Sequence, residues 1–134
     1  MKNFINTMQI AFTAAGGYLG WILGGLDGFL YALLAFVVID YGTGLMLAII
    51  ERKLSSEIGF RGIFKKIFIF LMVAIGHTID AHIIQNGSAI RTAVIFFYIS
   101  NEGISILENA ASIGLPVPDK LKAILKQLNE EESK

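Results

Sequence analysis

Three groups of polar side chains in this sequence have residue types and spacings that could do chemistry. Asp40 interrupts a long apolar run and is followed by two glycines. His77 and Asp80 lie three residues apart, a spacing that on a helix suits metal ligands or a proton relay. A third group repeats along one helical stripe and its shoulder, and consists of Asn101, Glu102, Ser105, Glu108, Asn109 and Ser112. Such groups can carry protons or ions, bind a metal, or join helices.

The pair His77 and Asp80 is a weak signal for a metal centre. Zinc sites use three or four protein ligands, and no third ligand with its own helical spacing accompanies these two residues. A polar cluster near a membrane face, closing on Arg91 across the turn at residues 85–88, fits them better. We therefore expect no metal, no cofactor and no enzyme activity.

Asp40 stands in the middle of an apolar run from about residue 29 to residue 50, which is long enough to cross a bilayer. An ionised carboxylate at the centre of a membrane helix costs roughly 2.5–3.5 kcal/mol, whereas each Leu, Ile, Phe or Val returns only about 0.3–0.6 kcal/mol. The carboxylate is therefore expected to face protein or water. The residues expected to line a pore or to pack inside the membrane are Asp40, Gly44, Asp80, Asn101, Glu102, Ser105 and Glu108.

The composition places the whole chain among membrane proteins. Of its 134 residues, 54% are hydrophobic and only 16% are charged, and the mean hydropathy is +0.64. A small soluble domain could not bury so much apolar surface. The formal net charge of zero argues against a nucleic-acid partner, because nucleic-acid-binding domains carry a basic excess.

The charge pattern divides the chain into four apolar segments, at about residues 4–26, 29–50, 67–84 and 91–111. The first is longer than the core of a signal peptide, so a retained helix is favoured over a cleaved leader. The fourth is interrupted by polar residues, and it either crosses the membrane or lies on its surface. The sequence predicts an all-α integral membrane protein, one domain over residues 1–134, with about four spans and a short amphipathic helix at 119–130.

Basic residues predict the orientation. They are concentrated between the second and third segments, in an expected loop at residues 51–66 that contains Arg52, Lys53, Arg61, Lys65 and Lys66. The positive-inside rule places this loop in the cytoplasm, and four crossings then place both termini there too. The same charges would attract the anionic headgroups of membrane lipids.

Glycine recurs every fourth residue in the first segment, at Gly16, Gly20, Gly24 and Gly28. On one continuous helix these residues would form a single face. Glycine at this spacing lets two membrane helices approach closely and gain dispersion contacts. We therefore expect this face to serve in oligomerisation, with either another copy or another span as its partner; the alternative is a loose, flexible helix.

Several short motifs carry a resemblance when they are taken in order. They are Ile39 and Asp40 with Thr43, Gly44 and Ala48; Leu54, Ser55 and Ser56 with Phe60, Gly62, Lys65 and Lys66; and residues 101–109 ahead of Gly114 and Pro116. Over roughly residues 29–128 the chain resembles the toxin secretion/phage lysis holin family, including the holin-like protein of clostridial toxin loci. It differs from the many holins with a basic tail, because it ends in acidic residues at 130–132.

The resemblance implies a small phage-encoded or phage-derived protein, without catalytic residues, that gathers as a homo-oligomer in the bacterial cytoplasmic membrane. It would then open lesions through which an endolysin or a toxin leaves the cell. The polar residues alone would also suit a small ion channel or a proton-coupled transporter. The size of what passes separates these functions, since a holin passes a folded enzyme. Met8 could serve as a second start site.

Overall fold

The computed structural model describes residues 1–133, with side chains through Gln127. The described chain folds into helices joined by short connections. They are α1 (Lys2–Ile22), α2 (Gly28–Ile50), α3 (Ser56–Thr78), η1 (Ile79–Ile84), α4 (Ala89–Ile113) and α5 (Asp119–Ser133). Segment η1 is a π-helical continuation of α3. The all-α class and the C-terminal amphipathic helix are as the sequence predicts.

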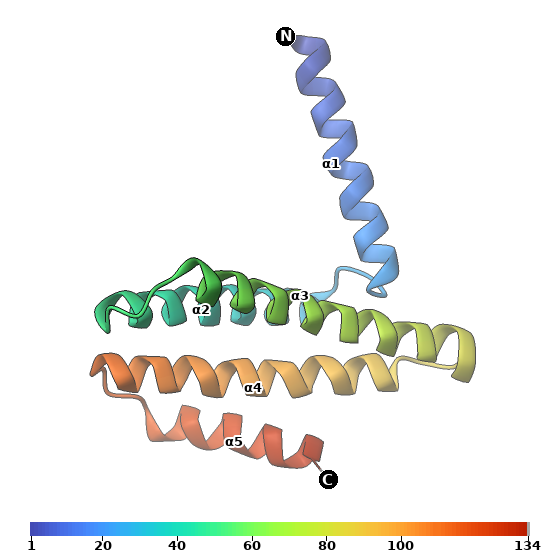
Figure 1. Cartoon of the computed structure of the whole chain (residues 1–134). Helices are drawn as coiled ribbons and strands as arrows, with labels where there is room; N and C mark the ends of the chain where they lie inside the picture. The colour runs from blue at the N-terminus through green and yellow to red at the C-terminus, as the bar shows by residue number, and fades with distance from the viewer. Residues whose placement is uncertain (134) are drawn as a thin grey trace.

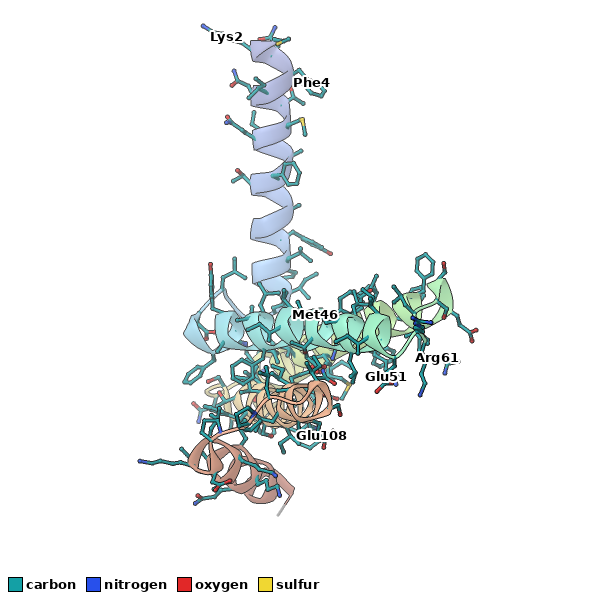
Figure 2. All side chains as sticks on the ribbon, turned by 90° about the vertical axis from the view of Figure 1, so that its left-hand side faces the viewer. Lys2, Phe4, Met46, Glu51, Arg61 and Glu108 are labelled. Carbon is teal, nitrogen blue, oxygen red and sulfur yellow. The ribbon has the colours of Figure 1, made fainter. Side chains whose placement is uncertain are left out.

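Helix α4 is the central element of the bundle. Helices α2 and α3 pack on one side of it, and α5 folds back along the other side (Figure 1). Helix α1 projects steeply away from the bundle and makes only a small contact with α3. Figure 2 shows its tip, with Lys2 and Phe4, far from every other helix.

Local sequence signals explain where the helices begin and end. The Asp27 and Ser55 side chains accept hydrogen bonds from the backbone N–H groups of Leu30 and Ile58, which caps α2 and α3. Helix α4 ends at Gly114, whose φ of 104° is a left-handed conformation that glycine adopts without strain. The two prolines that follow prevent the helix from continuing.

The core is a single apolar cluster shared by three helices. Its buried members are Leu30, Leu33, Val37, Ile69, Val73, Ile95 and Ile99. On each helix they recur at spacings of three and four residues, so that each helix turns one stripe inward. Most other large apolar side chains are exposed, as expected for helices whose outer surface contacts lipid.

Three of the described helices, not four, are long and apolar enough to cross a membrane: Gly28–Ile50, Ser56–Ile84 and Ala89–Ile113. The expected first span at residues 4–26 is wrong by this measure. The helix ends at Ile22, and polar residues lower its hydropathy, namely Asn3, Asn6, Thr7, Gln9 and Thr13. The fourth segment is long and apolar enough to cross. Helix α4 also packs along α2 and runs in the same direction.

Two further expectations need correction. The loop expected at residues 51–66 is mostly helical, since α3 begins at Ser56 and therefore includes Arg61, Lys65 and Lys66. The glycine face is also broken, because Gly24 lies in the turn after α1 with a φ of 86° and Gly28 begins α2. Only Gly16 and Gly20 remain on one face of α1.

Candidate functional site

A buried charge cluster joins the three candidate spans. Lys66 of α3 donates hydrogen bonds to both Asp40 of α2 and Glu102 of α4, and its Nζ lies 2.5 Å from Glu102 Oε2. The two carboxylate residues are only 7% and 6% exposed. One ammonium group therefore pairs with two carboxylates inside the bundle.

Neutral polar side chains complete the cluster. Asn109 donates to Asp40 Oδ1 at 3.3 Å and to Thr43 Oγ1 at 3.0 Å. The Thr43 hydroxyl in turn donates to backbone carbonyl oxygens of its own helix. Ser105 lines the same groove as Asp40 and Asn109. Among the described residues, every buried side-chain nitrogen and oxygen has a hydrogen-bond partner, so the network meets the requirement for burying polar groups.

Helix geometry places the three charges at one level. Asp40 lies about three helical turns before the end of α2, and Lys66 lies about three turns after the start of α3. Glu102 lies about three turns before the end of α4. Because α3 runs antiparallel to α2 and α4, these positions coincide, at a depth of about 15 Å from that end of the bundle. That depth is about half of a 30 Å hydrocarbon layer.

A groove of about 230 Å³ leads to this cluster, and its lining includes Asp40, Lys65, Lys66 and Asn109. Isolated charges at mid-bilayer are costly, and they are usually found paired or beside water. The cluster is paired, since its two acids share the Lys66 cation, and a groove reaches them.

Tyr41 closes the α2–α3 contact next to the cluster. Its hydroxyl donates to the Gly59 carbonyl oxygen at 3.1 Å. A Cβ on Gly62 would lie 3.0 Å from the Tyr41 ring, so Gly62 is small because the ring occupies that space. The glycines at 59 and 62 thus have a packing role.

A second polar cluster ties the start of α4 to the turn after α1. The Arg91 guanidinium donates to the carbonyl oxygens of Leu23 and Gly25, at 2.5 and 2.9 Å, and to Asp27 at 2.8 Å. Arg91 is only 4% exposed. Its hydrogen bond holds the pKa of Asp27 below the usual value.

Asp80 belongs to this second cluster as a helix cap. Its two carboxylate oxygens accept from the backbone N–H groups of Ile90 and Arg91, at 3.1 and 2.8 Å. The first turn of α4 leaves such N–H groups without partners in its own helix, and a carboxylate there also complements the helix dipole. The expected closure of this region on Arg91 is thus found, through the Arg91 backbone.

The structure brings some of the predicted site residues together and separates others. Asp40, Glu102 and Ser105 meet in the buried cluster, and Gly44 lies beside Asn109. Asn101 is half-buried, whereas Glu108 is exposed and lies on a different groove, between α4 and α5. Of the five basic residues, Arg52, Lys53, Arg61 and Lys65 are exposed.

Lys66 is the main residue whose role the sequence reasoning missed. It was assigned to the loop because it immediately precedes the apolar run at residues 67–84. The position of Lys66 along α3 could have indicated its role, because Asp40 and Lys66 are nearly equidistant from the connection between α2 and α3. In an antiparallel helix pair, residues equally far from the connection lie side by side.

A bundle of apolar helices around a buried charge cluster defines an integral membrane protein that spans the bilayer several times. The profile of the bacteriophage holin family matches residues 17–130. The chain therefore belongs to the bacteriophage holin family.

The chain is also similar to three curated relatives, one of which is named as a probable holin. A probable holin of Bacillus phage phi105 is 37% identical over 90 residues, which cover 67% of this chain and 66% of the relative. An uncharacterized 14.9 kDa protein of Clostridium perfringens is 42% identical over 98% of this chain and 99% of its own length. An uncharacterized protein of Halalkalibacterium halodurans is 49% identical over 76% of this chain and 78% of its own. No solved structure matches the chain.

Proposed function

We propose that the protein is a holin that assembles into homo-oligomers in the bacterial cytoplasmic membrane and opens lesions there. An endolysin, or a toxin, then leaves the cell through the lesion. The observation that carries this proposal is the cluster of Asp40, Lys66 and Glu102 at mid-depth between all three candidate spans. Family membership and the probable holin of phage phi105 support the same role.

The cluster gives the chain two ways to satisfy the same charges. In a dispersed protein the acids and the lysine pair with one another, so that the bundle tolerates the surrounding lipid. When copies gather, the same side chains can turn toward water at the edge of a lesion. A chain of 134 residues is too small to enclose a passage for a folded enzyme, so many copies must share its wall.

The proposed orientation follows the distribution of basic residues. The connection between α2 and α3, with Arg52 and Lys53, lies in the cytoplasm together with α5, and the turn at residues 85–88 lies outside. The amino terminus lies inside if α1 also crosses and outside if it stays on the surface. Single cysteines at Asn3, Ser56 and Ser88, in a chain without native cysteine, distinguish these cases by labelling intact cells with an impermeant reagent.

Expression together with an endolysin tests the function. The endolysin should lack an export signal, and the host should supply no other holin. We expect normal growth, then abrupt depolarisation, and a collapse of culture density only when both proteins are present. The control is a strain that expresses this protein alone, which should lose viability without immediate clearing.

Retention of the endolysin in depolarised cells would contradict the proposal. If cells depolarise while the endolysin activity stays in the cytoplasm, the lesion passes ions only. The protein would then act as a channel, and the holin proposal would be rejected.

A further inference from the structure

Helix α5 covers one face of α4 on the side opposite the charge cluster. Among the α5 side chains that the structure describes, at residues 119–127, Leu125 is the buried one, at 6% exposed. It fits against Gly103, where an added Cβ would lie 2.9 Å from both terminal carbons of Leu125 and 3.1 Å from Phe36. Beside this contact, α4 and α5 enclose a groove of about 420 Å³ whose lining includes Glu108, Ala111 and Lys126.

The depth of this contact conflicts with a lipid environment. Gly103 lies about three helical turns before the end of α4, which is about 15 Å into the bundle. In a crossing α4 this is close to the middle of the hydrocarbon layer. The seated α5 would carry Lys122 and Lys126, both exposed, toward that depth. Charged side chains there need water or a partner.

Helix α5 can avoid this cost by leaving α4. It is joined to α4 by a short segment with two prolines, and among its described side chains, those through Gln127, only Leu125 is buried. Its three lysines at positions 120, 122 and 126 suit the anionic cytoplasmic surface of the membrane. Departure of α5 uncovers the α4 face around Gly103, Leu107 and Ala111.

We infer that the α4 face covered by α5 is the surface through which a second copy of this chain packs, and that α5 blocks it until it is released. The inference rests on the proposed holin function and names its assembly surface. A second copy fits better than lipid for two reasons. The space left beside Gly103 by its missing side chain, the Gly103 notch, already accepts a leucine side chain. Small residues also allow close helix approach in membranes. The neighbouring Glu108 carboxylate is excluded by lipid but tolerated by a neighbouring copy or by water between copies.

Disulfide crosslinking between copies tests this surface, with copper–phenanthroline added as the oxidant to isolated membranes because the cytoplasm keeps thiols reduced. The background variant is Ala111→Cys, which places the chain's one cysteine on the groove. Adding Leu125→Glu should unseat α5 and raise the fraction of disulfide-linked dimer in membranes several-fold before lysis. Termination after Pro118, which removes α5, should have the same effect. In the chain terminated after Pro118, where α5 cannot be displaced, adding Gly103→Leu fills the space at Gly103 and should lower the dimer fraction below that of the truncation alone.

Ile124→Glu is the matched control, because it adds the same charge to an exposed neighbour on α5. It should leave the dimer fraction unchanged. An unchanged fraction with Leu125→Glu or with the truncation overturns the inference, as does an equal rise with Ile124→Glu. Endolysin release is measured in the same strains. Dimers that respond as expected, in strains that all retain the endolysin, support the surface and count against the holin function.

Discussion

The bundle contains two buried ionic sites that differ in how their charges are held. At one end, Arg91 donates to two backbone carbonyl oxygens and to Asp27, while Asp80 accepts from two backbone N–H groups. At mid-depth, Lys66 and its two acids bond mainly to other side chains. Backbone partners are fixed by the helices and turns, whereas side-chain partners can rotate away.

This difference assigns the two sites different roles. The Arg91 site joins the turn after α1, segment η1 and the start of α4, so breaking it should loosen the fold. The Lys66 site holds one cation and two acids beside a groove, and under the proposed function we expect it to rearrange while the helices keep their positions. Five predictions test this comparison.

Lys66→Met should have the largest effect on stability. It leaves two buried carboxylates without a cation, and removal of one partner from a buried pair costs about 3–5 kcal/mol. Thermal unfolding in detergent, followed by circular dichroism, and the amount of protein in membranes would both report the loss. The double variant Asp40→Asn, Lys66→Met removes one of the two acids and should recover part of the stability. No recovery would mean that the acids do not depend on Lys66.

Arg91→Met should cost somewhat less, about 3 kcal/mol, because two carbonyl oxygens and Asp27 lose their donor. Asp27 is half-exposed and can turn to water, which limits the cost. The same unfolding measurement applies. Arg91→Lys should be intermediate, since lysine lacks the fork that reaches all three acceptors. A stability equal to wild type for Arg91→Met would contradict a fold-holding role.

Gly24→Ala should destabilise the Arg91 site by more than Gly25→Ala does. Both glycines have positive φ, at 86° and 112°, so both substitutions introduce backbone strain. Only at Gly24 would the new Cβ also meet other groups, at 2.6 Å from His77 Nδ1 and 2.7 Å from Arg91 Nε. We expect a difference of about 1–2 kcal/mol between the two variants. Equal unfolding temperatures would show that the close approach is not needed.

Asp40→Asn should change stability by about 1 kcal/mol or less, because Lys66 keeps Glu102 as a partner and the shape of the side chain is preserved. Lysis timing should nevertheless shift, since the cluster then holds one acid and one cation. Timing is read from culture density with an endolysin present. Unchanged timing together with unchanged protein abundance would remove Asp40 from any role in triggering.

The smallest effect is the pH dependence contributed by Asp27. Arg91 depresses the pKa of this carboxyl in the folded state, so its contribution to stability is present above the unfolded pKa, about 3.9, and is lost as the pH falls through the lower folded value. Unfolding in detergent should therefore show no contribution from Asp27 between pH 6 and 8, and a loss below about pH 4. In Asp27→Asn, which retains a capping side chain, this acidic loss should shrink. An identical acid profile would contradict the pairing.

Local patterns in the sequence determined the class of protein and much of the helix content. The apolar runs predicted spans at 29–50 and 91–111 close to the bounds of α2 and α4, and an amphipathic helix was predicted at 119–130, where α5 lies. The cost of a charge in lipid indicated that Asp40 would face protein or water, and in the structure it is buried against protein groups. Each of these results depends on one helix at a time, which is why the sequence sufficed.

The tertiary structure decided how those helices use their polar residues. The glycine repeat predicts one face only if the helix is continuous, and it breaks at Gly24, where the chain must turn to receive Arg91. Lys66 looked like a loop residue until the start of α3 and the antiparallel packing set its depth beside Asp40 and Glu102. Which side chains share a level in a membrane depends on helix ends and direction, and these are fixed by contacts between distant segments.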